Sequence, residues 1–200
     1  MPQLRVLRNG QSFCVVGSQD VWMFSASVWA DVWGPEASTL DISGGSKRRA
    51  DGTSDFLTWA MPHELSRGDA IDIFFEPGVE SNPKGTLFTP EPKSAPDAGA
   101  RFSSWPPSDA ELSEWEARPS INSSLSWSLV LNGAPPVHVA PEINRQHIGM
   151  HILWNEERPE RLRVNLSKRS IREICARENG EELLLEYVPI GSHVQLAIGA

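Results

Sequence analysis

The sequence predicts a mainly β fold made of two similar antiparallel units, and three observations support this. One pattern of apolar segments occurs twice, at a separation of about 123 residues. These segments are short and are bounded by Gly, Pro and Asn, as in antiparallel sheets. A proline-rich stretch without long apolar runs lies between them. We therefore expect a β-rich α+β protein, with pseudo-symmetric units at 1–76 and 127–200 and a connection at 77–126.

The repeat is clearest at the ends of each unit. The units begin with Arg5-Val6-Leu7-Arg8-Asn9-Gly10 and Ser128-Leu129-Val130-Leu131-Asn132-Gly133. They close with Gly68-Asp69-Ala70-Ile71-Asp72-Ile73 and Gly191-Ser192-His193-Val194-Gln195-Leu196. Further matches pair Val28-Trp29-Ala30-Asp31 with Leu153-Trp154-Asn155-Glu156, Leu40-Asp41-Ile42 with Leu162-Arg163-Val164, and Phe56-Leu57-Thr58-Trp59 with Leu183-Leu184-Leu185-Glu186.

Local signals predict the strands of the first unit. Asn9-Gly10 favours the two positive φ values of a type I′ turn, so a hairpin is expected over 4–16. Alternation predicts a strand with four side chains on one face, namely those of Trp22, Phe24, Ala26 and Val28. The later strands are expected at 38–42, ended by Gly44-Gly45, at 55–60, ended by Pro62, and at 70–75.

The connection is predicted to hold one short helix. Eight prolines between 77 and 119 exclude a continuous sheet there. Ser108 and Glu111 have capping-box spacing, which predicts a helix over 109–117. Trp105 and Trp115 are expected to attach the connection to the rest of the protein.

The second unit is expected to follow the same plan, with a turn at Asn132-Gly133 and strands at 148–154 and 161–166. Residues 170–178 allow two interpretations. Ser170 and Glu173 have capping-box spacing, whereas Asn179-Gly180 fits either a helix end or a hairpin turn. We favour the helix.

Composition excludes some classes of function. The chain of 200 residues has 40% hydrophobic and 22% charged residues, as an ordinary folded protein does. Its net charge of −8 argues against a nucleic-acid ligand, because phosphate backbones are bound by clustered Lys and Arg. The basic runs 47–49 and 158–163 are expected to be solvated loops. Among eight tryptophans, Trp22, Trp29 and Trp33 are expected to pack in the core.

The chain has neither a signal-peptide pattern nor an apolar segment long enough to span a bilayer, so a cytoplasmic protein with no membrane partner is expected. Cys14 and Cys175 form no Cys-x-x-Cys motif. Two buried free thiols are the favoured interpretation, and a bridge between the halves is the alternative.

No pattern in the sequence predicts catalysis, a cofactor or a metal. His147 and His151 are four residues apart, but Gly149 and the β-branched neighbours favour a strand, on which two imidazoles lie too far apart to chelate easily. The nucleophile motif Gly-x-Ser-x-Gly is absent. Gly44-Gly45-Ser46-Lys47 lacks the spacing of a phosphate-binding loop.

The connection and one strand end supply the candidate partner-binding residues. Acidic side chains on the predicted helix would attract a basic protein surface, and an exposed tryptophan would mark a binding hot spot. These candidates are Trp33, Trp105, Asp109, Glu111, Glu114, Trp115 and Glu116.

Three segments of the first unit resemble a known group of proteins. Leu57-Thr58-Trp59, Gly68-Asp69-Ala70-Ile71-Asp72-Ile73 and Glu76 are similar to segments of small cytoplasmic proteins that bacteria encode beside polymorphic and contact-delivered toxins. The second unit departs from this pattern, with Glu186 and Gly191-Ser192 at the matching positions. The resemblance implies an immunity protein that blocks the active surface of a toxin and has no catalytic residues.

The leading functional hypothesis is thus a non-enzymatic protein-binding protein, an immunity protein whose partner is a cognate toxin with a basic surface. One alternative is a carbohydrate-binding module that uses exposed tryptophans. Another is a hydrolase or metalloenzyme that uses His147, His151 and nearby carboxylates.

Overall fold

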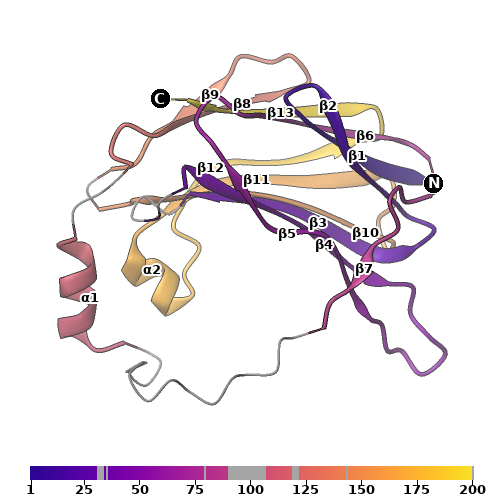
Figure 1. The fold of residues 1–200 in the computed structure, drawn as a ribbon, viewed down its shortest axis with the longest axis horizontal. Helices are drawn as coiled ribbons and strands as arrows, with labels where there is room; N and C mark the ends of the chain where they lie inside the picture. The colour runs from indigo at the N-terminus through magenta and orange to yellow at the C-terminus, as the bar shows by residue number, and fades with distance from the viewer. Residues whose placement is uncertain are drawn as a thin grey trace.

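The computed structural model of this chain consists of two antiparallel β-sheets stacked face to face (Figure 1). It describes residues 1–30, 34, 36–78, 80–89, 107–118, 122–142 and 144–199. Sheet A has the strand order β2-β1-β6-β13-β8-β9, and sheet B has the order β12-β11-β10-β3-β4-β5-β7.

Both sheets draw strands from both halves of the chain. Sheet A contains β1 (Pro2–Arg8), β2 (Gln11–Gly17), β6 (Ala70–Pro77), β8 (Ser126–Leu131), β9 (Val137–Val139) and β13 (Ser192–Gly199). Sheet B contains β3 (Val21–Ala30), β4 (Ser38–Ser46), β5 (Phe56–Leu65), β7 (Thr86–Leu87), β10 (His147–Asn155), β11 (Arg161–Arg169) and β12 (Glu181–Pro189).

The predicted repeat is present as a pseudo-two-fold arrangement. The order β2-β1-β6 in sheet A is mirrored by β9-β8-β13, each read from the edge toward the centre. In sheet B, β3-β4-β5 is mirrored by β10-β11-β12, each read outward from the centre. The halves meet where β6 pairs with β13 and β3 with β10. Asp72 lies opposite Gln195, 123 positions further along, in the central pair of sheet A. The expected fold class is therefore confirmed, and the two units share one hydrophobic core.

The Asn-Gly turns show how closely the two copies agree. Asn9 and Asn132 have φ values of 52° and 51°, each followed by a glycine of positive φ. Each asparagine amide reaches the start of the unit's last strand, where Asn9 Nδ2 donates to Asp69 Oδ1 at 2.6 Å and Asn132 Nδ2 to Ser192 Oγ at 3.2 Å. The side chain thus holds the first hairpin of each unit against its closing strand.

The core lies between the two sheets and is formed by alternate residues of their strands. Phe24 and Trp154 stack there with ring centroids 4.9 Å apart. Because strand side chains alternate between faces, the intervening residues point away from the core and form the outer faces of the sandwich.

Both predicted helices form where their caps were expected. In α1 (Asp109–Glu116) and α2 (Ile171–Ala176) the N-cap serine and the glutamate three residues later make both capping-box hydrogen bonds. Figure 1 shows α1 and α2 beside each other, on the side of sheet B that faces away from sheet A. Arg172 of α2 joins them, because its guanidinium donates to Asp109 and Glu116 of α1.

Two strand predictions were wrong for one physical reason, which is that tertiary pairing overrode a local breaker signal. Gly44-Gly45 lies inside β4, where a Cβ on Gly44 would come within 2.6 Å of a carbonyl of β3. Pro62 lies inside β5, next to an irregularity in the pairing with β4. At such an irregularity the ladder does not need the backbone N–H that proline lacks.

The tryptophan predictions also need correction. Trp29 points out of the sandwich and is 39% exposed, whereas Trp154, with which the repeat alignment paired it, is 2% exposed. Trp22, at an irregularity of the β3–β4 pairing between Val21 and Met23, is half-buried and does not belong to the core cluster. Trp33 lies outside the described residues.

Cys14 and Cys175 are both buried free thiols, so the favoured interpretation is confirmed. Burial raises the pKa of the Cys14 thiol to about 12. In the part of the chain that the structure describes, no helix has the length and apolarity needed to cross a bilayer.

Candidate functional site

The outer faces of the two sheets differ in how their charges are compensated. On sheet A, Arg5 forms an ion pair with Glu76 at 2.9 Å and lies over the ring of Phe74. Phe74 stacks on His193, which contacts Asp72 at 2.8 Å. The charges of this face are therefore paired within the chain.

The outer face of sheet B carries arginines in place of such pairs. Arg161, Arg163 and Arg169 alternate along β11 with buried apolar residues, so they share the face directed away from the core. Arg158 precedes them in the turn after β10. The expectation that 158–163 is only a solvated loop was wrong for Arg161 and Arg163, because β11 begins at Arg161. We call the outer surface of β10, β11 and β12, with Trp29 of β3 and Arg158, the arginine face.

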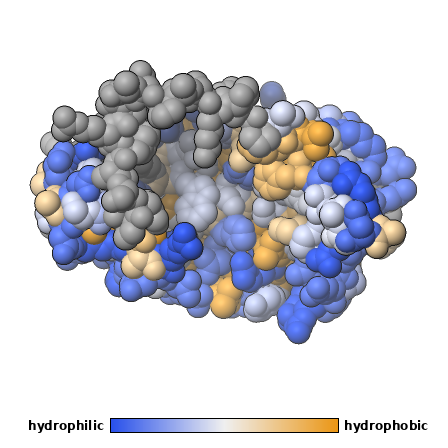
Figure 2. Space-filling view, turned by 90° about the horizontal axis from the view of Figure 1, so that it is seen from below, coloured by the Kyte–Doolittle hydropathy of each residue, from blue (hydrophilic) through white to orange (hydrophobic). Residues whose placement is uncertain are grey.

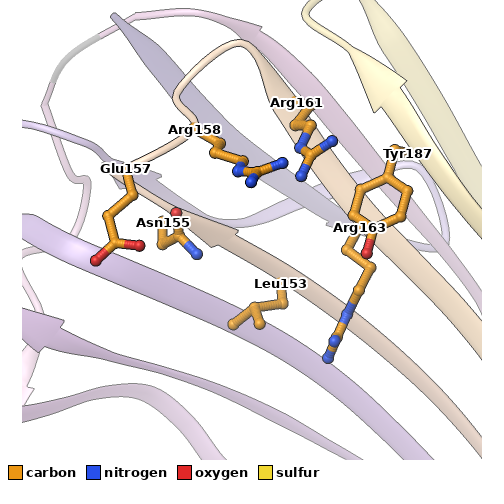
Figure 3. A pocket seen from close by; sticks show the side chains of 7 residues that line it. All are labelled: Leu153, Asn155, Glu157, Arg158, Arg161, Arg163 and Tyr187. Atoms are coloured by element: carbon orange, nitrogen blue, oxygen red, sulfur yellow. The ribbon is translucent and has the colours of Figure 1, made fainter.

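Three adjoining hollows cross the arginine face. One of about 160 Å³ is lined by residues that include Leu153, Asn155 and Arg158 (Figure 3). It shares Arg163 and Tyr187 with a second of about 480 Å³. The second shares Trp29 and Arg169 with a third of about 230 Å³. Figure 2 views the molecule from this side, where hydrophobic residues lie among hydrophilic ones. The hollows together form a groove along the face.

The smallest hollow brings like charges together. Figure 3 shows the guanidinium groups of Arg158 and Arg161 pointing toward each other, while Glu157 points away from them. Among the described residues, no carboxylate lies within ion-pair distance of Arg158, Arg161 or Arg163. Glu157 also lines this hollow but forms no ion pair with these arginines, so their charges are unpaired among the described residues and three positive groups face one negative group.

Two buried polar atoms of the same hollow have no hydrogen-bond partner among the described residues. They are Nε of Arg163, a donor, and Oδ1 of Asn155, an acceptor. A buried polar atom without a partner costs about 1–3 kcal/mol, so such atoms are uncommon unless a ligand or water satisfies them.

Aromatic rings hold the arginines in place. The Arg161 guanidinium lies over the Tyr187 ring, 4.4 Å from its centroid, and that of Arg169 lies 5.3 Å from the centroid of Trp29. Trp29 lies flat on the sheet, because Gly149 is directly opposite on β10 and a Cβ there would be 2.4 Å from the indole. Gly149 therefore allows Trp29 to form the floor of the groove.

His151 lies at the middle of the groove beside Arg163, whose Nη2 is 3.3 Å from Nδ1 of the imidazole. Burial lowers the pKa of His151, and the positive charges of Arg163 and Arg169 lower it further. The neutral imidazole can accept a hydrogen bond from Arg163 and orient it, so its role here is positioning.

The residues proposed from the sequence as a partner site are engaged within the chain where they are described. Asp109 and Glu116 form ion pairs with Arg172, Glu111 caps its own helix, and Glu114 pairs with Arg118. Trp115 is half-buried, while Trp33 and Trp105 lie outside the described residues. Their role in partner binding stays a prediction.

Sequence reasoning did not select the arginine face, although the alternation of arginines from 161 to 169 is visible in the sequence. It did place His147 and His151 on one strand. Among the described residues, no group of three or more His, Cys, Asp or Glu side chains could hold a metal ion.

Comparisons with protein-family models, with curated proteins and with solved structures found no match to this chain.

Proposed function

We propose that this chain is a non-catalytic protein-binding protein. Within that class, we propose a cytoplasmic immunity protein that covers the active surface of a cognate toxin, with the arginine face as its docking surface. Because this face is positive, it would meet an acidic part of the toxin, in place of the basic surface expected from the sequence. The observation that carries the proposal is a groove of uncompensated arginines beside two exposed aromatic rings. Arg, Trp and Tyr are the residue types that dominate binding energy at protein interfaces.

The rigidity of the frame supports this proposal. The arginine face lies on paired strands of a seven-stranded sheet, and the central strands are backed by the shared core. A surface fixed before binding loses little conformational entropy on association. Loops would give a less precise surface.

The carbohydrate alternative is less well supported by the same face. Sugars stack on bare aromatic ring faces, but the rings of Trp29, Tyr187 and Trp22 each carry an arginine guanidinium. A change of tryptophan fluorescence with a panel of neutral oligosaccharides would favour the carbohydrate alternative.

The test uses the protein encoded beside this chain's gene in its native host. That neighbour is produced in cells with and without this chain, and growth is measured. We expect the neighbour to arrest growth and this chain to restore it. A neighbour that is harmless, or a toxic one that this chain neither binds nor neutralises, would refute the proposal.

A matched pair of variants tests the docking surface. Tyr187→Asp changes an exposed aromatic residue on the arginine face, and Leu87→Asp changes an exposed apolar residue on β7, at the opposite edge of sheet B. Calorimetry should show at least about tenfold weaker binding for Tyr187→Asp and unchanged binding for Leu87→Asp. The reverse order would place the docking surface elsewhere.

A further inference from the structure

We infer that the hollow lined by Asn155, Arg158, Arg161, Arg163 and Tyr187 is a carboxylate pocket, which receives a glutamate or aspartate side chain from an extended acidic segment of the partner. This inference rests on the proposed function, because it names the chemistry that the same face recognises.

The guanidinium groups of this hollow concentrate positive charge. Two guanidinium groups that point toward each other repel, and an anion between them converts that repulsion into two attractions. A carboxylate fits this position well, because the planar fork of an arginine matches its two oxygens. The whole chain carries a net charge of −8, so the local excess of positive charge is a property of this place on the surface.

Arg163, which lines this hollow, has a hydrogen-bond donor that is not used within the described residues. Arg163 Nε is buried and has no partner among the described residues, although Nη2 of the same group contacts His151. Figure 3 shows the Arg163 guanidinium pointing away from those of Arg158 and Arg161, so the acceptor for Nε would come from the part of the bound segment that continues toward the second hollow.

The hollow is large enough for one side chain and is continuous with the larger hollow beside it. A volume of about 160 Å³ is below the range typical of cofactor and drug-sized sites, but it can hold one side chain. Through Arg163 and Tyr187 it opens into the larger hollow beside it. A segment that places one acidic residue in the pocket can therefore continue along the groove.

The two copies of the repeat carry different residues at the place of Arg163. In the sequence match between β4 and β11, Arg163 occupies the position that Asp41 has in the first unit. The same strand of the same frame thus tolerates an acid at this place. The fold therefore does not require an arginine here, and the residue type at this place is free to suit a ligand.

The experiment measures binding of a short dye-labelled peptide rich in glutamate by fluorescence anisotropy, with a glutamine-containing peptide of the same length as control. The wild-type chain should bind the acidic peptide, bind the glutamine peptide at least about tenfold more weakly, and lose affinity as salt rises. Equal binding of both peptides would overturn the inference.

Matched arginine variants locate the binding. Arg158→Ala and Arg161→Ala should each weaken acidic-peptide binding roughly tenfold or more. Arg48→Ala is the control, because Arg48 also lies over an aromatic ring, 4.1 Å from the centroid of Trp22, but outside this pocket. An equal loss with Arg48→Ala would show general charge attraction and overturn the pocket. Circular dichroism of each variant checks its fold.

Competition and partner binding separate the remaining outcomes. If free glutamate or inorganic phosphate competes as well per molecule as the peptide, the hollow is a general anion site and the extended segment is refuted. If the toxin binds undiminished to the Arg158→Ala and Arg161→Ala variants, the pocket fails and the proposed function stands. If the acidic peptide binds but this chain has no protein partner, the function fails and the pocket stands.

Discussion

Replacing Asp69 by serine should destabilise the protein more than any comparable change in the second unit. The Asp69 carboxylate is nearly buried and accepts from Arg8 Nη2 at 2.6 Å, Asn9 Nδ2 at 2.6 Å and the Ser66 N–H at 2.7 Å. Serine is the residue at the matching place of the repeat, Ser192, so the Asp69→Ser variant copies one unit's chemistry into the other.

The size of the effect follows from these bonds. Asp69→Ser keeps a hydroxyl for Asn9 but removes charge-assisted bonds from Arg8 and from the Ser66 N–H. Hydrogen bonds to a charged group each contribute about 1.5–3 kcal/mol, and Arg8 regains some water, so a loss of about 2–3 kcal/mol is expected. For a protein of this size that lowers Tm by roughly 5–10 °C. Ser192→Ala loses one neutral bond of 3.2 Å and should cost about 1 kcal/mol.

Urea denaturation at several pH values is the assay. Burial alone would raise the pKa of Asp69, but the bonds from Arg8, Ser66 and Asn9 outweigh burial and lower it below its usual value. The stability due to Asp69 is therefore complete above the carboxyl's unfolded pKa and disappears as pH falls through the lower folded value. If Asp69→Ser costs no more than Ser192→Ala at neutral pH, or if its deficit persists unchanged in acid, the reasoning is wrong.

Three further predictions concern the helices, the groove and the core. Arg172→Ala should speed proteolysis around α1 but change global stability by less than about 1 kcal/mol, because its ion pairs with α1 are exposed; equal cleavage rates would contradict this. The pKa of His151 is lowered, so the folded protein binds fewer protons there than the unfolded chain, and the free energy of unfolding should fall as pH drops below about 6.5. The variant His151→Gln should flatten that part of the stability profile. An unchanged profile would count against the burial of the imidazole. Cys14, with a pKa of about 12, should stay unmodified by a thiol reagent at pH 8 until urea unfolds the chain; reaction in the native state would show that the core opens.

Features governed by neighbouring residues could be predicted from the sequence. The Asn9-Gly10 turn follows from the backbone freedom of two residues, and the caps of α1 and α2 follow from serine and glutamate three positions apart. The repeat predicted two pseudo-symmetric units, because similar segments fold into similar strands, but it left open whether the units would form one core or two lobes. Predictions failed at Gly44-Gly45 and Pro62, where the neighbouring strand decides whether a breaker can be accommodated.

The arginine face was less accessible to sequence reasoning for a related reason. Alternation places Arg161, Arg163 and Arg169 on one side of a strand, but it cannot say whether carboxylates from other strands face them. On sheet A an arginine does meet such a carboxylate, as Arg5 meets Glu76. Only the order of the strands reveals which arginines remain uncompensated.

In both sheets, the central strand pair can form only after the second half of the chain has been synthesised. β6 pairs with β13, the last strand in the described chain, and β3 must find β10 across the long connection. Closing loops of this length is entropically costly, so contacts of such high sequence separation slow folding. The first half leaves the ribosome with two edge strands still unpaired, and these edges can recruit foreign strands. Chaperone dependence and aggregation of truncated chains should therefore exceed those of the finished protein.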